Sequence, residues 1–136
     1  MSNKGQLSHV EIYFSNLKIS TIFWKWFLEE LGYKQFQKWE DGISWKLGNT
    51  YLVFVQTLIK FNSTKYHRCQ TGLNHLAFIA DSQNDVDKMY KKLKQKNIPI
   101  LYEDNYLNGG DDEAYSIFFE DPDRIKVEYT FNNLNN

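Results

Sequence analysis

The sequence has little of several features that mark particular protein classes. Its 136 residues contain a single cysteine, Cys69, and two prolines. One cysteine cannot form an internal disulfide, which excludes a disulfide-stapled secreted domain and favours a reducing compartment. The longest apolar runs, such as Tyr51–Val55, span five residues, whereas a membrane-spanning helix needs roughly 20. The first ten residues contain no apolar stretch typical of a secretory signal.

An excess of charge of one sign is also lacking. Sixteen Lys and Arg residues stand against seventeen Asp and Glu residues, for a formal net charge of −1. Because nucleic-acid-binding domains usually carry a basic excess or stripe, no nucleic-acid partner is expected. Aromatic residues are abundant at 17% and apolar residues reach 42%, a composition typical of a folded globular protein. We therefore expect one cytoplasmic domain over residues 1–136, with no membrane partner.

Hydrophobic periodicity in the first half predicts a strand, a helix and three further strands. Residues Leu7–Phe14 alternate between apolar and polar, the period of a half-buried strand. An apolar stripe at helical spacing follows, with Ser20 as the predicted N-cap and Gly32 just beyond the predicted C-terminus. Turn signals then separate three short strands. These strands are expected at Tyr33–Trp39, at Ile43–Leu47 and from about residue 51 to Gln56.

The second half repeats this pattern. A strand is expected at Leu73–Ile79, and Ser82 with Asp85 three residues later predicts the start of a helix that ends at Asn97. A longer loop is expected at Asn105–Asp112, where two adjacent glycines lie. Three further strands are expected at Ile100–Glu103, Tyr115–Glu120 and Ile125–Tyr129.

The same βαβββ order therefore occurs twice, which predicts an internal repeat. Module one is expected at about residues 6–57, a linker at about 58–71 and module two at about 72–130. The stretches LSHV and LNHL align, which makes His9 equivalent to His75, and we align Gln56 with Glu128 on the last strands. If the two halves are alike and related by a pseudo-twofold axis, these four side chains are expected to converge.

Such a set of side chains favours a divalent metal site. Imidazole and carboxylate are ligand types that hold borderline metals, and two His with one carboxylate leave positions open for a substrate. On the last strand, Lys126 and Glu128 share one face while Val127 and Tyr129 share the other, so the ionic face must meet water or a wet cavity. The alternative is that these residues form the solvated face of an antiparallel sheet.

Two segments resemble a known family. The stretch GLNHLAF at Gly72–Phe78, the amphipathic helix after it, and FFEDPDRIKVEY at Phe118–Tyr129 resemble the second module of the vicinal oxygen chelate superfamily. That superfamily includes glyoxalase I, fosfomycin-resistance thiol transferases, extradiol dioxygenases and bleomycin-resistance proteins. The resemblance covers about residues 6–130. It implies an α+β fold in which two βαβββ modules form an open, cup-shaped mixed sheet with the helices on its outer face.

The resemblance also implies a divalent metal, which could be Zn, Ni, Mn or Fe. The ligand positions of the metal-dependent members fall on His9, Gln56, His75 and Glu128. The glyoxalase pattern usually has a Glu where Gln56 stands, and a glutamine can coordinate only through its neutral carbonyl oxygen. Without Gln56 the set is two histidines and one carboxylate, similar to the sets of the fosfomycin-resistance proteins and extradiol dioxygenases.

The resemblance implies a metal-dependent lyase of the glyoxalase I type. Its small substrate would chelate the metal through vicinal oxygens and lose a proton from the neighbouring carbon. Glu128 is the expected proton-transfer base, with Glu11 or His67 as alternatives. Thiol transfer to an epoxide and oxygen chemistry at Fe(II) stay open, because they need only the three remaining ligands.

Three further residues are candidates for binding the small-molecule substrate: Arg68, Tyr13 and Lys126. Arg68 could hold a carboxylate or phosphonate bidentately, and the alternative is that it belongs to a solvated linker. A non-catalytic protein that sequesters a flat drug, as bleomycin-resistance relatives do, is the second functional hypothesis. A homodimer is expected, in which the two modules of one cup come from one chain or from two.

Overall fold

The computed structural model describes residues 2–104 and 114–132. The chain splits into two compact units, Met1–Lys65 and Tyr66–Asn136. The predicted linker is therefore divided, because its last residues belong to the second unit. The loop expected at Asn105–Asp112 lies outside the described residues.

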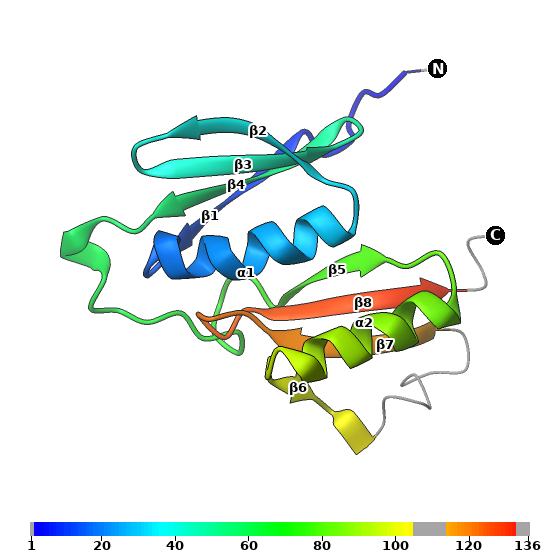
Figure 1. The fold of residues 1–136 in the computed structure, drawn as a ribbon. Helices are drawn as coiled ribbons and strands as arrows, with labels where there is room; N and C mark the ends of the chain where they lie inside the picture. The colour runs from blue at the N-terminus through cyan, green and yellow to red at the C-terminus, as the bar shows by residue number, and fades with distance from the viewer. Residues whose placement is uncertain (1, 105–113, 133–136) are drawn as a thin grey trace. The chain divides into compact units, whose positions relative to one another are not determined.

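The first unit contains a four-stranded mixed sheet and a helix (Figure 1). The strand order is β1-β4-β3-β2, with β1 parallel to β4 and the other pairs antiparallel. A short 3-10 helix follows the last strand. The elements are β1 (His9–Phe14), α1 (Leu17–Glu30), β2 (Lys34–Trp39), β3 (Gly42–Leu47), β4 (Thr50–Gln56) and η1 (Ile59–Phe61).

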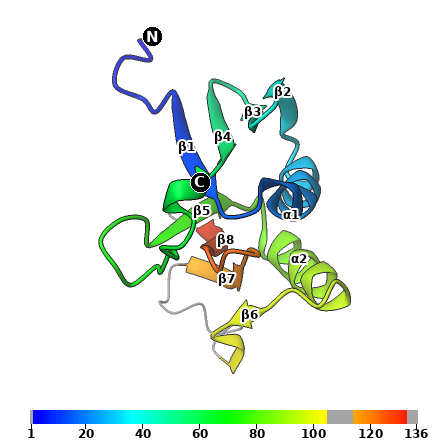
Figure 2. The same ribbon diagram turned by 90° about the vertical axis from the view of Figure 1, so that its left-hand side faces the viewer.

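The second unit has the same topology, with the order β5-β8-β7-β6 and β5 parallel to β8. Its helix lies along one face of its sheet in both views (Figure 2). The predicted α+β class and the two βαβββ modules are thus confirmed. The elements are β5 (His75–Ile79), α2 (Gln83–Gln95), β6 (Ile100–Leu101), β7 (Ala114–Glu120) and β8 (Lys126–Asn132).

Local sequence explains most of the helix ends. Ser82 caps α2 by accepting a hydrogen bond from the backbone N–H of Asp85, as predicted. The prediction that Ser20 caps α1 is wrong. Asn16 is the N-cap, because its extended backbone lets the side-chain oxygen accept from the N–H of Ile19. Ser20 instead lies inside the helix and is buried.

Strand alternation sorts the side chains of the first sheet. The apolar face packs against α1, and four aromatic residues at its centre are completely buried: Phe14, Trp24, Phe27 and Phe54. The Phe14 and Phe54 rings meet edge to face at 5.0 Å, a favourable aromatic geometry. The opposite face of β1 carries the exposed side chains of His9, Glu11 and Tyr13.

The second sheet follows the same rule. Val127 on β8 is completely buried and Tyr129 nearly so, and both lie on the face that meets α2. Lys126 and Glu128 alternate with them and are partly buried on the other face. The predicted division of the last strand into an apolar and an ionic face is confirmed. Among the described residues, no helix is both long enough and apolar enough to span a membrane.

Candidate functional site

The polar face of the second sheet brings together a histidine and a carboxylate. The Nε2 atom of His75 on β5 lies 3.1 Å from Oε1 of Glu128 on β8. The parallel register pairs Glu128 with the residue two positions after His75, and alternation puts both side chains on one face. Both side chains are partly screened from water, with 32% and 17% of their surfaces exposed.

The other ring nitrogen of His75 is also engaged. Its Nδ1 lies 2.7 Å from the side-chain oxygen Oδ1 of the preceding Asn74. An amide oxygen only accepts, so Nδ1 carries the proton and donates it. In the neutral ring Nε2 then presents its lone pair to the Glu128 carboxylate. Nε2 of His75 and Oε1 of Glu128 are both atom types that bind a divalent metal.

One oxygen of Glu128 is held by the hydroxyl of Ser116, which in turn contacts the hydroxyl of Thr130. The Oγ of Ser116 lies 3.0 Å from Oε2 of Glu128 and 2.6 Å from Oγ1 of Thr130. Because an ionised carboxylate only accepts, Ser116 donates to Glu128 and accepts from Thr130. Ser116 is buried, with 4% of its surface exposed. The chain of hydroxyls therefore fixes one carboxylate oxygen and leaves the other directed toward His75.

This donor set fits a divalent metal. Ligand atoms about 2.0–2.2 Å from a metal lie about 3 Å from each other when they occupy neighbouring coordination positions. The 3.1 Å between Nε2 of His75 and Oε1 of Glu128 meets this requirement. A ligating histidine typically donates its other N–H to an oxygen, as His75 does to Asn74. Across the two described stretches, however, no group of three or more His, Cys, Asp or Glu side chains gathers that could hold a metal.

The strand registers correct the predicted equivalence of Gln56 and Glu128. Glu128 pairs with the residue two positions after His75. In the first unit, the residue two positions after His9 pairs with Val53. The counterpart of Glu128 is therefore Val53, and Gln56 lies three residues farther along β4. The first module has no carboxylate at this position.

The side chain of Gln56 serves the structure of the first unit. Its amide oxygen accepts a hydrogen bond from the backbone N–H of Leu17 at 2.8 Å, in the first turn of α1. Its amide nitrogen donates to the backbone oxygens of Ser15 at 2.9 Å and Thr57 at 3.3 Å. These contacts join the last residue of β4 to the start of the helix, and they occupy the carbonyl oxygen through which a glutamine would bind a metal.

The remaining predicted residues of the first unit lie on the exposed face of β1. His9 stacks on the ring of Tyr51 with centroids 4.7 Å apart, and its Nδ1 lies 3.2 Å from the hydroxyl of Ser8. Glu11 and Tyr13 follow on the same face, and both are exposed. His9, Glu11 and Tyr13 thus share one surface, as alternation predicted.

Arg68 enters a network of polar contacts that joins the start of the second unit to the β7–β8 turn. Its Nη1 lies 2.8 Å from Oε1 of Glu120 and donates to the backbone oxygen of Arg124 at 3.2 Å. The other oxygen of Glu120 lies 3.5 Å from Nε of Arg124. The Arg68–Glu120 pair is largely buried, with 18% and 10% of the side chains exposed. Arg68 is therefore committed to an internal ion pair.

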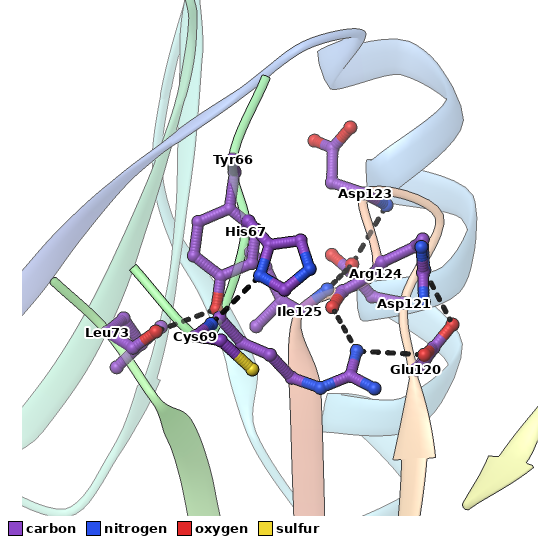
Figure 3. A network of polar contacts seen from close by, with 10 residues as sticks. Tyr66, His67, Cys69, Leu73, Glu120, Asp121, Asp123, Arg124 and Ile125 are labelled. Atoms are coloured by element: carbon purple, nitrogen blue, oxygen red, sulfur yellow. Dashed lines mark hydrogen bonds and ion pairs between the residues drawn. The ribbon is translucent and has the colours of Figure 1, made fainter. Parts of the chain in front are cut away.

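The turn beside this pair is shaped by Asp121. Its carboxylate accepts from the backbone N–H groups of Asp123 at 2.9 Å and Ile125 at 2.8 Å (Figure 3). Arg124 adopts a left-handed backbone with φ of 65°, a conformation that needs such support in a residue other than glycine. The turn sets where β8 begins, and hence where Glu128 falls on it.

His67 lies next to this network on the exposed segment before β5. Its Nδ1 accepts a hydrogen bond from the backbone N–H of Cys69 at 3.0 Å (Figure 3). The neutral ring therefore carries its proton on Nε2. Burial raises the pKa of the nearby Tyr66 phenol, whose hydroxyl donates to the backbone oxygen of Leu73 at 2.7 Å.

Lys126 lies beside His75, its partner across the parallel strands. Its ammonium is 5.5 Å from the ring centroids of both Tyr102 and Phe118. Phe118 pairs with Glu128 across the antiparallel strands and meets the His75 ring edge to face at 6.1 Å. The ammonium of Lys126 is thus held against Phe118, whose ring also contacts His75.

Sequence reasoning missed the residues that support this site: Asn74, Ser116, Thr130, Tyr102 and Phe118. Ser116 could have been noticed in the sequence as a serine within an otherwise apolar predicted strand. The signal for Asn74 was an amide directly before a candidate ligand. Nothing local marks Tyr102 and Phe118, because the sequence does not show which side chains their rings face.

Comparisons with known proteins agree with this architecture. The sequence model of the Glyoxalase/Bleomycin resistance protein/Dioxygenase superfamily matches residues 6–129. A Bacillus subtilis (strain 168) relative, described as uncharacterized protein YqjT, is 53% identical over 122 residues, which cover 90% of this chain and 95% of the relative. A crystal structure from Bacillus halodurans, described as a candidate glyoxalase, is 51% identical with a TM-score of 0.91, covering 94% of this chain and 96% of the other.

More distant structures share the fold. Lactoylglutathione lyase from Agrobacterium tumefaciens is 19% identical with a TM-score of 0.68, covering 98% of each chain. The genomically encoded fosfomycin resistance protein FosX from Listeria monocytogenes is 18% identical with a TM-score of 0.70, covering 96% of each chain. On the match over residues 6–129 and the 53% identity to the Bacillus subtilis relative, the chain belongs to the Glyoxalase/Bleomycin resistance protein/Dioxygenase superfamily.

Proposed function

We propose that the protein is a metal-dependent enzyme of glyoxalase type. Its small substrate chelates a divalent metal through vicinal oxygens and undergoes proton transfer at the neighbouring carbon. One observation carries the proposal: Nε2 of His75 faces Oε1 of Glu128 at 3.1 Å while Asn74 holds the proton of the other ring nitrogen. This arrangement leaves two electron-rich ligand atoms directed at one point.

His9 is the proposed third ligand. It occupies the position of module one that corresponds to His75, and its ring lies on the exposed polar face of β1. Gln56 is proposed as a structural residue and not a ligand, because its carbonyl oxygen caps α1. His9 would come from the same chain or from the second copy of a homodimer. Mixing a His9→Ala protein with a Glu128→Gln protein separates these cases, since metal binding recovers only when ligands from two chains complete one site.

When bound, a divalent metal supplies Lewis acidity that polarises the coordinated oxygens of the substrate. Glu128 is the proposed base once its Oε1 is no longer a metal ligand: Oε1, which Ser116 does not hold, would accept the proton and then return it to the substrate to give the product. The Ser116 hydroxyl keeps the other oxygen in place. Glu11 and His67 are the alternative bases, and Glu128 is preferred because it lies beside His75.

A second candidate chemistry rests on Val53. Because this residue stands where the counterpart of Glu128 would be, the proposed ligand set contains two histidines and one carboxylate. That set is typical of non-haem Fe(II) oxygenases, and it would also suffice for addition of a thiol to an epoxide. These reactions are the alternatives to isomerisation on the same site.

The experiment that tests the metal site is metal analysis of untagged protein by mass spectrometry, after incubation with Ni, Co, Zn, Mn or Fe and removal of the excess. We expect near-stoichiometric metal in the wild type and its loss in His75→Ala and Glu128→Gln. His67→Ala is the matched control, because His67 lies outside the proposed ligand set. A wild type that takes up none of these metals would overturn the proposal.

The reaction is tested separately with the metal-loaded protein. Turnover of the methylglyoxal–glutathione adduct above the uncatalysed rate supports the isomerase. If metal binds but no tested metal accelerates that reaction, the isomerase is excluded, and thiol addition to an epoxide and dioxygen uptake with catechols are assayed next. Thermal stabilisation by a flat drug and none by metal would replace the enzyme with a drug-sequestering protein.

A further inference from the structure

The second sheet contains a cation whose surroundings differ from those of a solvated surface lysine. Lys126 lies across the strand from His75, and its ammonium rests on two rings, 5.5 Å from the centroids of Tyr102 and Phe118. Such contacts hold a cation by electrostatic attraction to the ring faces. The two ring contacts therefore restrict the position of the Lys126 side chain.

The backbone conformation of Tyr102 supports the view that the fold holds the Lys126 side chain in a specific position. Tyr102 has a positive φ of 54°, which costs free energy in a residue other than glycine. Its ring meets Phe118 edge to face at 5.5 Å. The left-handed residue thus presents its ring to Phe118 and to the ammonium of Lys126, although 54% of the Tyr102 surface stays exposed.

Two carboxylates on the same face of the second sheet, those of Glu120 and Glu128, are engaged by residues other than Lys126. Glu120 is its partner across the antiparallel strands, but Arg68 and Arg124 bind the two carboxylate oxygens of Glu120. Glu128, two residues along β8, is directed to His75 and Ser116. Among the residues that the structure describes, no carboxylate forms an ion pair with Lys126. Within residues 2–104 and 114–132, the Lys126 ammonium is therefore positioned beside the proposed metal ligands without a paired carboxylate.

We propose that the substrate is anionic, with a carboxylate, phosphonate or phosphate group that Lys126 binds while its vicinal oxygens meet the metal. Tyr102 and Phe118 are then specificity-determining residues, because they hold the ammonium where the acid group arrives. This inference rests on the proposed function and names its substrate class. It also assigns the acid-binding role to Lys126 and not to Arg68, whose guanidinium is committed to Glu120.

The test uses two probes that chelate through the same vicinal oxygens and differ in one remote charge: 3,4-dihydroxybenzoate and 3,4-dihydroxybenzamide. The protein is loaded with zinc, which has no redox chemistry, and its zinc content is measured first. Dissociation constants are then measured by calorimetry. We expect the acid to bind about tenfold more tightly than the amide, as a charge-assisted contact supplies.

Variants test which residues are responsible for the preference for the acid over the amide. Lys126→Met should abolish the preference for the acid and leave binding of the amide unchanged, whereas Lys91→Met, an exposed lysine on α2, should keep it. Tyr102→Phe should retain the preference, because the ring remains, and Tyr102→Leu should weaken it. The comparison of acid with amide on wild-type protein needs no variant, so it stands even if a variant fails to fold.

Two results overturn the inference alone: zinc-loaded wild type binds acid and amide equally, or the preference for the acid survives in Lys126→Met. A wild type that takes up nickel, cobalt, manganese or iron but not zinc is tested with that metal in the same way. Failure of the wild type to take up zinc and all four of these metals is a different result. It would overturn the proposed metal function and the inference with it, and the metal measurement distinguishes this failure from the other two.

Discussion

The amide oxygen of Gln56 accepts a hydrogen bond from the backbone N–H of Leu17 at 2.8 Å, across 39 residues of sequence. The N–H groups in the first turn of a helix have no partner within the helix. A side chain from the end of β4 therefore satisfies a group that Asn16, the N-cap, does not reach. Since the same amide donates to Ser15 and Thr57, both of its ends are used.

Replacement of Gln56 by Glu tests this structural role. The new carboxylate keeps the acceptor for Leu17, but it puts a negative charge against the backbone oxygens of Ser15 and Thr57. We expect Gln56→Glu to lower the free energy of unfolding by about 1–3 kcal/mol, the cost of leaving such groups unsatisfied. Urea unfolding followed by tryptophan fluorescence measures it.

The same variant bears on metal binding. If Gln56 is structural, the added carboxylate leaves the metal affinity unchanged, although a glutamate is the residue that the glyoxalase pattern usually has there. Gln56→Met is the control, because it lacks both the acceptor and the new charge and should lose comparable stability. A clear gain in metal affinity in Gln56→Glu would show that position 56 reaches the metal.

The sequence predicts the repeated βαβββ order because period and turn chemistry are local properties. The alignment of His9 with His75 also follows from short matching stretches. The alignment of Gln56 with Glu128 failed because the partner of each residue in a sheet depends on strand register, which a residue count cannot reveal. The register makes Val53 the counterpart of Glu128. Nothing in the sequence marks this residue, because a valine in a strand is typical of the core.

The role of Arg68 was beyond the sequence for a related reason. A basic residue in a polar linker looks solvated, and its partner Glu120 lies 52 residues away. Only the folded second unit brings the two together. Similarly, Lys126 was identified from its face of β8, but the rings of Tyr102 and Phe118 that hold its ammonium come from other segments.

A substitution of Asn74 tests how the His75 ring is oriented for metal binding. Its side-chain oxygen holds the proton on Nδ1 of His75 at 2.7 Å, which leaves Nε2 available to a metal. Residues that orient a ligating histidine typically contribute about 10–100-fold to metal affinity. We expect Asn74→Ala to weaken metal binding by that factor, measured by competition with a chromogenic chelator.

The matched control is Asn74→Asp, which keeps an accepting oxygen in the same position and should retain most of the affinity. Asn74 is exposed, so neither variant is expected to change the unfolding midpoint of the metal-free protein much. Equal losses of metal affinity in Asn74→Ala and Asn74→Asp would contradict the role assigned to the oxygen.

The Arg68–Glu120 ion pair should contribute to the stability of the second unit. Removing one member of a largely buried pair leaves the other charged and unpaired. We expect Arg68→Met to lower the free energy of unfolding by about 3 kcal/mol, measured by chemical denaturation. Glu120→Gln should cost a similar amount, and the double variant should lose less than the sum of the two.

This double-mutant cycle also separates structure from substrate binding. If Arg68 only fastens the segment before β5 to the β7–β8 turn, folded Arg68→Met at low temperature binds the acid probe as the wild type does. A selective loss of affinity for 3,4-dihydroxybenzoate, with unchanged affinity for the amide, would return Arg68 to the substrate site.

The pH dependence of stability has a defined contribution from Glu103. Hydrogen bonds from Lys94 at 2.8 Å and from the Tyr90 hydroxyl at 2.6 Å hold the pKa of Glu103 below its usual value of 4.5. A carboxyl whose pKa is lower in the folded state stabilises that state above its unfolded pKa. The contribution is lost as the pH falls through the lowered folded value. Glu103→Gln should therefore flatten the decline of the unfolding free energy below pH 4.5.

The same contacts act in the opposite direction at high pH. The hydrogen bond to Glu103 raises the pKa of Lys94 above 10.5, so its contribution is present below that value and is lost as the pH rises through the raised pKa. Glu103→Gln should flatten this alkaline decline as well, whereas Glu40→Gln, at an exposed carboxylate in the first unit, should leave both limbs unchanged. Urea denaturation at closely spaced pH values measures both limbs, and a wild-type slope preserved in Glu103→Gln would mean that other groups set the pH dependence. Because Glu103 is exposed to solvent, added salt should reduce the difference between the two proteins.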